Sequence, residues 1–364
     1  MRSSTIARPW AAWAMTSLFV VGTLGLFAGC TPPGEKPDDT PGNTQPATQD
    51  GKKPEGKLKV GIVFDSGGIG DKSFNDSAWA GIQKAEKEFG IEVSKIESKV
   101  EKDYEPNLTA MADDGNDLVI AVGLAQGKAL EKVAKQYPDT KFAIVDGFVT
   151  ADNVRMLHFS EEQGSYLVGY IAGKMTKTGK VGFVGGEALD LIKKFQYGFQ
   201  AGVKAANAKA EILPPKYTGS WENIDEAKIA ANLLFDSGAD IVYHAAGRAG
   251  LGVIQAAKER KKFAIGVDRD QDDEAPGFVL TSMVKNVDAA VYETIKDMVD
   301  GKFTAGEVSY DVAHGGVGIS ALRFTKDMIG PDVLAEIEAI KQKIADGSLK
   351  VPSTEAEYAA FKPE

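Results

Sequence analysis

From Lys57 onward, short runs of apolar residues alternate with longer segments in which apolar residues recur every three or four positions. The short runs are apolar throughout rather than at every second position, which is typical of parallel strands that helices cover on both faces. We predict strands at Lys57–Phe64, Glu92–Ser98, Leu118–Gly123, Lys141–Asp146 and Val154–Phe159, and then at Lys180–Val184, Ile212–Tyr217, Ile241–Ala245, Phe263–Asp268 and Phe278–Val284. Helices are predicted between them, for example Ala78–Phe89, Gly127–Tyr137, Gln163–Met175 and Ala249–Lys258.

Two successive series of such strands predict an α/β protein with two doubly wound, Rossmann-like lobes. In open parallel sheets, ligands bind beyond the carboxyl ends of the strands. Polar or aromatic residues follow strand ends in both series, at Asp65, Asp146, Trp221, His244–Gly247 and Asp268. Their common placement predicts a cleft between the lobes.

The N-terminus has the layout of a secretory signal peptide. Arg2 and Arg8 precede the apolar stretch Trp10–Phe27, which ends in the small residues Ala28 and Gly29. A retained membrane helix is the alternative, although the stretch is at the lower limit of length for spanning a bilayer. We predict that residues 1–29 are a signal peptide.

Cys30 is the only cysteine in the chain, so it can form neither an internal disulfide nor a multi-thiolate metal site. Together with the residues before it, Cys30 resembles a bacterial lipobox, although Phe27 stands where an aliphatic residue is favoured. The resemblance implies lipidation of Cys30, and two or more acyl chains anchor a protein stably. Residues 30–56 are rich in Pro, Gly, Thr and Asp, which predicts a disordered tether on the outer side of the bacterial cell membrane.

Composition argues against several functional classes. The net charge of −10 with no basic stripe argues against nucleic-acid binding. The histidines His158, His244 and His314 show no metal-ligand spacing, so we expect structural roles for the first two and no metal or cofactor. No Gly-x-Ser-x-Gly elbow is present, and carboxylate runs such as Glu161-Glu162 and Asp272–Glu274 are typical of solvated faces. We therefore predict no catalytic residues and no enzymatic activity.

The stretch DSGGIGDKSFNDSAW (Asp65–Trp79) follows a strand and precedes a helix, the layout of a phosphate-binding loop. However, Asp71 separates Gly70 from Lys72, and a carboxylate at that point would repel a phosphate. The dinucleotide pattern also lacks its third glycine. Phe74 and Asn75 at the helix start could instead recognise a flat polar ring, by stacking on its face and hydrogen bonding to its edge. Phe74 as an ordinary core residue is the alternative.

Val60–Ile82 (VGIVFDSGGIGDKSFNDSAWAGI) resembles the opening signature of the basic membrane lipoprotein family. These proteins are substrate-binding lipoproteins of ATP-binding-cassette transporters, and characterised members bind purine and other nucleosides. Further collinear matches occur at Tyr137–Gly147, Glu161–Gly173, Lys180–Gly186, Tyr197–Val203, Tyr217–Asn223, Ile241–Glu259, Gly266–Gln271 and Leu280–Tyr292. The resemblance covers roughly Lys57–Ser320.

The resemblance implies a type I periplasmic-binding-protein fold in which the chain crosses between lobes three times, here near Ser160, Lys285 and Thr304. Lobe I would then comprise residues 57–160 plus 286–304, and lobe II residues 161–285 plus 305–364. It further implies a monomer that captures a nucleoside by lobe closure and delivers it to a membrane permease. A sugar or other small ligand, or a receptor role without transport, are the alternatives.

The resemblance also implies the ligand contacts. A purine base would lie between Phe74 of lobe I and Trp221 of lobe II. The remaining contacts would be Asn75 and Asp146 to the polar edge of the base, Asp65, Asp268 and Lys285 to the ribose hydroxyls, and the backbone of Gly247 close to the ligand.

Two residues depart from the family pattern. Trp221 stands where the family more often has Phe, which keeps an aromatic face. Arg248 stands where a small residue is common, so it either points away from the site or narrows it. Alternatives also remain for three of the expected contacts, because Asp146 and Asp268 could be helix N-caps and Lys285 a surface lysine.

Overall fold

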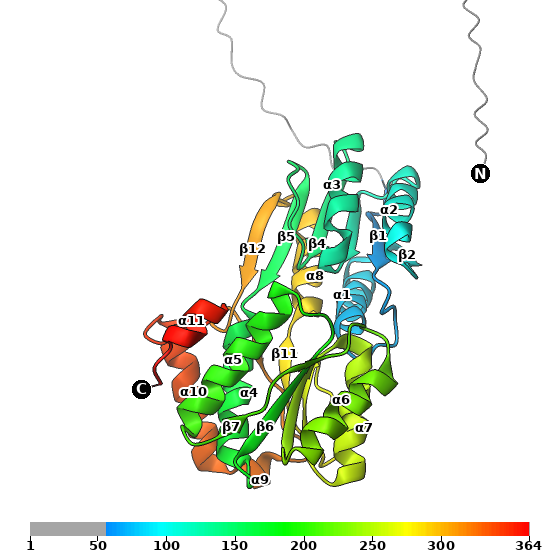
Figure 1. The fold of residues 1–364 in the computed structure, drawn as a ribbon. Coiled ribbons are helices and arrows are strands. Elements are labelled where there is room, and N and C mark those ends of the chain that lie inside the picture. The colour runs from blue at the N-terminus through cyan, green and yellow to red at the C-terminus, as the bar shows by residue number, and fades with distance from the viewer. Residues whose placement is uncertain (1–55, 364) are drawn as a thin grey trace, which may run out of the picture. The chain divides into compact units, whose positions relative to one another are not determined.

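The computed structural model describes residues 56–363 and contains two mainly parallel sheets, each packed between helices (Figure 1). The predicted signal peptide, Cys30 and all but the last residue of the tether lie outside the described residues. Among residues 56–363, no helix is both long enough and apolar enough to cross a membrane.

The sheet of lobe I has six parallel strands in the order β12-β5-β4-β3-β1-β2. Its strands are β1 (Lys59–Phe64), β2 (Glu92–Glu97), β3 (Leu118–Val122), β4 (Lys141–Val145), β5 (Val154–Phe159) and β12 (Gly306–Tyr310). Its helices are α1 (Phe74–Phe89), α2 (Tyr104–Asp113), α3 (Gly127–Gln136) and α8 (Val287–Val299). Every residue of β3 is buried because α1 and α8 pack on one face of the sheet, and α2 and α3 on the other.

The sheet of lobe II has the order β13-β11-β10-β9-β6-β7, with β8 also paired to β6. Its strands are β6 (Lys180–Gly185), β7 (Glu211–Ile212), β8 (Lys216–Tyr217), β9 (Ile241–Ala245), β10 (Phe263–Asp268), β11 (Val279–Lys285) and the antiparallel β13 (Val317–Ile319). Helices α4 (Glu161–Met175) and α5 (Asp190–Ala206) cover one face, and α6 (Ile224–Asp236) and α7 (Leu251–Arg260) cover the other. The C-terminal segment adds α9 (Lys326–Ile329), α10 (Pro331–Ala345) and α11 (Glu355–Ala360).

Helices α4 and α5 approach each other closely because glycines line their contact. A Cβ at Gly169 of α4 would meet the backbone of Phe199, and one at Gly202 of α5 would meet the backbone of Tyr166. The two helices therefore pack backbone to backbone.

The prediction of two doubly wound α/β lobes is confirmed, while several element boundaries differ. The strand predicted at Ile212–Tyr217 is two short strands, because Pro214 and Pro215 supply no N–H groups for a continuous ladder. Helix α1 begins at Phe74, earlier than predicted, since the side chain of Asp71 accepts hydrogen bonds from its first backbone N–H groups.

The chain returns to lobe II later than expected. We expected the third crossing near Thr304, with residues 305–364 in lobe II. Instead β12 pairs with β5 along its whole length, from Gly306 beside Arg155 to Tyr310 beside Phe159 (Figure 1). The crossing therefore lies between β12 and β13, because β12 satisfies the backbone groups of the open edge of β5.

Candidate functional site

A cavity of about 550 Å³ lies between the strand ends of the two lobes. All eight residues expected to bind ligand line it. Lobe I contributes Asp65, Phe74, Asn75 and Asp146, and lobe II contributes Trp221, Gly247, Asp268 and Lys285. Arg248 lines the cavity as well. Residues from many separate strand ends thus converge on one space, as the α/β topology requires.

Asp71 occupies the N-terminus of α1, where a bound phosphate would lie in a phosphate-binding loop. Its carboxylate accepts hydrogen bonds from the backbone N–H groups of Ser73 (2.8 Å), Asn75 (2.8 Å) and Asp76 (3.1 Å). These N–H groups and the helix dipole are the usual attraction for an anion, and here a side chain of the protein satisfies both. The glycine-rich loop is therefore not arranged to hold a phosphate.

Asn75 is fixed in orientation by two carboxylates. Its Nδ2 donates to Asp65 Oδ1 (2.8 Å) and to Asp71 Oδ2 (3.1 Å), so both amide hydrogens are used. Its buried Oδ1 has no partner among the described residues and remains free to accept a hydrogen bond. Burial raises the pKa of Asp65 to about 6, although the bond from Asn75 opposes this shift.

Asp268 ends β10 in a left-handed backbone conformation, with φ 65°, which a residue other than glycine adopts rarely. Burial raises the pKa of its carboxyl to about 7, against the opposing effects of Lys285 and of the hydrogen bond from Ser73. Asp146 follows β4 with the similar φ of 66°. Neither carboxylate caps a helix, so the alternative role as helix N-caps does not apply.

Lys285 is buried, with 1% of its surface exposed, and is therefore not a surface lysine. Its Nζ contacts both carboxylate oxygens of Asp146, at 2.7 and 2.6 Å, and Glu161 Oε1 at 2.9 Å. Burial disfavours the charged ammonium, but the carboxylates of Asp146, Glu161 and Asp268 outweigh it and hold the pKa of Lys285 above its usual range. Lys194 approaches Glu161 at 3.4 Å and brings a second positive charge.

We call Asp146, Glu161, Lys194 and Lys285 the hinge network, because Glu161 and Lys285 stand at two of the crossings between the lobes. Three aromatic rings also surround the ammonium of Lys285. Their centroids lie at 5.3 Å for Phe74, 4.8 Å for Phe159 and 5.7 Å for Phe195. Lys285 was expected at the ribose, but most of its hydrogen-bonding capacity is used within the protein.

Trp221 lies in the loop between β8 and α6, and its ring rests against Gly186 at the end of β6. A Cβ at position 186 would overlap the ring, so glycine is required there for Trp221 to adopt this position. Gly247, with φ 54°, begins a 3₁₀ turn directly beside Trp221. Arg248 extends toward the glycine-rich loop of lobe I, with Nη2 at 3.9 Å from the position of a Cβ on Gly70. Of its two alternatives, Arg248 therefore narrows the site.

Two carboxylates in acidic runs are buried, which corrects the expectation of solvated faces. Glu161 is fully buried at the start of α4, where it contacts Lys285. Asp272 is also buried, and its Oδ2 accepts from the backbone N–H of Arg323 at 2.9 Å. Sequence reasoning missed both residues because their runs give no sign of which carboxylate packs inward.

The histidines have the structural surroundings that were predicted. His158 lies in β5, where its ring contacts Glu307 and the carbonyl oxygen of Gly147, each at 2.9 Å. His244 is fully buried in β9, and burial lowers its pKa to about 4, so it is neutral. Among residues 56–363, no group of His, Cys, Asp and Glu side chains is arranged to hold a metal ion.

The fold and the cavity define the class of protein. Two parallel-sheet lobes, linked by three crossings and enclosing one cavity at the strand ends, form the type I periplasmic-binding-protein fold. A solute-binding protein of an ABC transporter system from Aeropyrum pernix has the same fold, with a TM-score of 0.74 and 30% identity, covering 83% of this chain and 96% of that one.

The chain belongs to the Bmp family, described as PnrA-like ABC transporter substrate-binding proteins, whose family model matches residues 58–355. It is 40% identical to the CD4+ T-cell-stimulating antigen of Listeria monocytogenes, over 80% of this chain and 87% of that protein. It is 32% identical to the ABC transporter nucleoside-binding protein BmpA of Lactococcus lactis, over 93% of this chain and 97% of that protein. The suspected family is therefore confirmed, and this protein is an ABC transporter substrate-binding protein.

Proposed function

We propose that this protein captures purine nucleosides in the cavity between its lobes and delivers them to a membrane permease. The observation that carries the proposal is the pair of aromatic side chains, Phe74 from lobe I and Trp221 from lobe II, that line one cavity together with buried carboxylates and a free amide oxygen. A volume of about 550 Å³ suits a ligand of nucleoside size, since small-molecule sites measure about 300–1,000 Å³.

The base is held between the two rings, where each stacking face contributes ~1–3 kcal/mol. Asn75 Oδ1 accepts a hydrogen bond from the edge of the base, because its Nδ2 hydrogens are already given to Asp65 and Asp71. The ligand must therefore present an N–H group at this point, as purine bases with an exocyclic amine or a protonated N1 do. Asp146 stands at the same edge.

The sugar is held by carboxylates. Asp65 and Asp268 accept hydrogen bonds from ribose hydroxyls, each worth ~1.5–3 kcal/mol when the acceptor is charged. Gly247 gives close access to the backbone, and Lys285 reaches a hydroxyl only in addition to its carboxylate partners. A nucleoside monophosphate would bring its charge toward several carboxylates and is rejected.

Binding favours a closed arrangement because each stacking ring belongs to a different lobe, so a ligand that touches both rings bridges the lobes. The closed protein then docks on its permease and releases the nucleoside without chemical change, so we expect no turnover. The Lactococcus lactis relative is named as nucleoside-binding, which supports this ligand class. The protein acts as a monomer. Lipidation of Cys30 would anchor it to the outer side of the cell membrane.

A calorimetric panel of nucleosides, free bases, nucleotides and sugars tests the ligand. Purine nucleosides should bind, and their 5′-monophosphates should bind at least tenfold more weakly. Trp221→Ala should weaken nucleoside binding by more than tenfold, because it removes one stacking face, while Trp221→Phe should retain most of the affinity. No heat with any nucleoside, or unchanged affinity in Trp221→Ala, contradicts the proposal, and chromatography of the incubated nucleosides checks that none is cleaved.

A further inference from the structure

Away from the hinge network, two hydrogen bonds join the lobes, beside a longer ion pair from Arg269 of lobe II to Asp76 of lobe I at 3.7 Å. Ser73 Oγ of lobe I donates to Asp268 Oδ2 of lobe II at 2.5 Å. Gln271 Nε2 of lobe II donates to the carbonyl oxygen of Lys72 in lobe I at 3.0 Å. Ser73 and Gln271 are buried, with 0% and 2% of their surfaces exposed, and neither lines the cavity. We call these two bonds the interlobe clasp.

Ser73 stands at a helix N-cap, where a serine hydroxyl ordinarily accepts a hydrogen bond from its own helix. Here the Ser73 side chain makes no such capping bond. The carboxylate of Asp71 accepts from the first N–H groups of α1 in its place. Asp71 therefore leaves the hydroxyl of Ser73 free to reach the other lobe.

Gln271 is held in one orientation by lobe II. Its Oε1 accepts from the backbone N–H of Val267 and from His244 Nε2, both at 3.0 Å. His244 is neutral, so the ring nitrogen that contacts Oε1 carries its single proton. With Oε1 satisfied inside lobe II, Nε2 is left facing Lys72.

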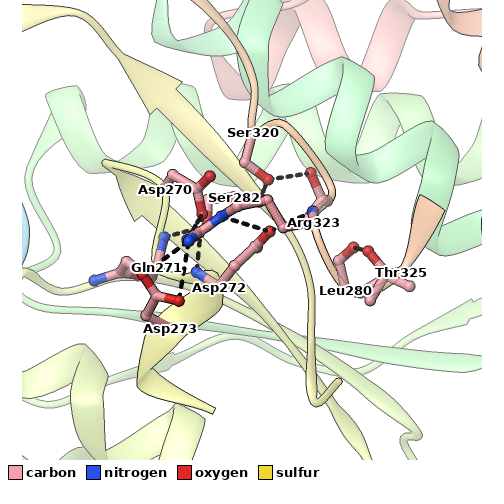
Figure 2. A network of polar contacts seen from close by, with 10 residues as sticks. Asp270, Gln271, Asp272, Asp273, Leu280, Ser282, Ser320, Arg323 and Thr325 are labelled. Atoms are coloured by element: carbon pink, nitrogen blue, oxygen red, sulfur yellow. Dashed lines mark hydrogen bonds and ion pairs between the residues drawn. The ribbon is translucent and has the colours of Figure 1, made fainter. Parts of the chain in front are cut away.

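The loop that carries Gln271 is anchored on its other side by Arg323, as Figure 2 shows. The guanidinium of Arg323 contacts Asp273 at 2.9 Å and Asp270 at 3.2 Å, and its backbone N–H donates to Asp272. The backbone N–H of Gln271 itself donates to Ser282 Oγ at 3.1 Å. Lobe II thus presents Gln271 on a loop fixed at both ends, as a positioning residue requires.

We propose that Ser73 and Gln271 are positioning residues that hold the lobes closed and thereby set how slowly the ligand leaves. Both bonds cross between lobes and exist only when the lobes meet, so they stabilise the closed arrangement and not the open one. Their loss speeds opening and ligand dissociation, while association with the open protein is little changed. The ligand readout rests on the nucleoside function proposed above, whereas closure itself can be measured without ligand.

The test uses Gln271→Glu and Ser73→Ala. The glutamate keeps an oxygen for Val267 and His244 but sets a carboxylate oxygen, in place of a donor, against the carbonyl of Lys72. Ser165→Ala is the matched control, because it removes a buried hydroxyl whose bond to Tyr243 Oη (3.1 Å) lies entirely within lobe II. Thermal unfolding identifies a variant that fails to fold. If Gln271→Glu or Ser73→Ala fails in this way, the other variant is used to test the clasp.

Stopped-flow fluorescence with inosine should show dissociation roughly tenfold faster in each clasp variant, as expected for losing one hydrogen bond in the closed state. Association should stay within about twofold, and Ser165→Ala should match the wild type in both rates. Because Ser73 also orients Asp268, the measurement is repeated with 2′,3′-dideoxyinosine. If the clasp holds the lobes closed, Ser73→Ala should speed the dissociation of 2′,3′-dideoxyinosine as much as that of inosine. If the dissociation rate of 2′,3′-dideoxyinosine is unchanged, the effect with inosine came from the contact between Asp268 and the ribose, and the role of Ser73 in closure is overturned.

Small-angle X-ray scattering of the ligand-free proteins gives the second readout. The radius of gyration of Gln271→Glu should exceed that of the wild type, because fewer molecules are closed. Wild-type dissociation rates and an unchanged radius of gyration would overturn the clasp. If no nucleoside binds the wild type, the proposed function fails, and the scattering comparison alone decides the clasp.

Discussion

The lobes are joined near the crossings by the ion pair between Lys285 and Asp146, and away from the crossings by the two hydrogen bonds of the clasp and a longer ion pair between Arg269 and Asp76. In the hinge network, the buried ammonium of Lys285 contacts the carboxylates of Asp146 and Glu161. In the clasp, a hydroxyl and an amide from Ser73 and Gln271 reach the opposite lobe. Both sets of bonds join groups far apart in the chain, but they differ in how far their partners move when the lobes separate.

Two residues of the hinge network, Glu161 and Lys285, stand next to crossings of the chain, where a pivoting motion displaces atoms least. Glu161 begins α4 just after the first crossing, and Lys285 ends β11 just before the second. Ser73 precedes α1 within lobe I, and Gln271 lies in the loop between β10 and β11 within lobe II, so neither stands where the chain crosses between the lobes. The hinge network should therefore persist in the open protein, whereas the clasp should break. This difference predicts that damage to the hinge lowers stability and damage to the clasp changes kinetics.

The largest expected effect comes from Lys285→Met. It leaves the buried carboxylates of Asp146 and Glu161 without their shared cation, and losing one partner of a buried ion pair costs about 3–5 kcal/mol. The free energy of unfolding of the ligand-free protein, measured by urea denaturation, should fall by that amount.

Lys194→Met is the control for this change. Lys194 approaches the same Glu161 at 3.4 Å, but 36% of its side chain is exposed, so its loss should cost under about 1 kcal/mol. Equal losses of unfolding free energy in the two lysine variants would mean that the buried ion pairs of Lys285 contribute no more to stability than the exposed Lys194 does. The proposed difference between the hinge network and the clasp would then be contradicted.

The second effect concerns the charge at the clasp. Burial raises the pKa of Asp268 to about 7, above the unfolded value of 3.8, so folding favours the protonated form. The stability from this group is fully present below pH 3.8 and is lost as the pH rises through about 7. Asp268→Asn cannot ionise, so at pH 8 the ligand-free variant should be more stable than the wild type by up to about 4 kcal/mol.

Thermal midpoints measured from pH 4 to pH 8 check this prediction, and the advantage of Asp268→Asn should shrink toward zero at the acid end. Asp190→Asn changes an almost fully exposed carboxylate and is the control; its thermal midpoint should follow that of the wild type at every pH. A constant offset across the whole range would show that the charge of Asp268 is already well solvated in the ligand-free protein.

The pattern of apolar residues predicted the two lobes well because burial on both faces leaves continuous apolar strands such as Leu118–Val122. Placing Asp65, Asp146 and Asp268 at strand ends was enough to predict that they would share one cavity. Such placement follows from topology and needs no knowledge of side-chain contacts.

The partners of those residues could not be predicted in the same way. Lys285 and Asp146 are 139 positions apart in the sequence, and only the packed sheets bring them together. Ser73 precedes a helix, where local sequence favours a capping role, yet its hydroxyl contacts the other lobe. Strand β12 returns to lobe I because the edge of β5 is available there, which is a property of the assembled sheet.

The smallest expected effect separates the roles of Asp71 and Ser73. Asp71→Ala removes the acceptor for three N–H groups at the start of α1 and should cost about 2 kcal/mol. Asn223→Ala, which removes the single capping bond to Glu226 N, should cost about 1 kcal/mol. Without Asp71, the hydroxyl of Ser73 should turn back to cap its own helix and leave Asp268.

This exchange predicts a coupling between two residues that can be measured. In the wild type, Ser73→Ala should remove no helix cap, but in the Asp71→Ala background it should cost a further ~1 kcal/mol, because Ser73 has by then become the cap. In the Asp71→Ala background, Ser73→Ala should speed inosine release no further, because the bond from Ser73 to Asp268 is already lost. If Ser73→Ala speeds inosine release equally in both backgrounds, the hydroxyl has not moved, and Asp71 is then a helix cap with no influence on the clasp.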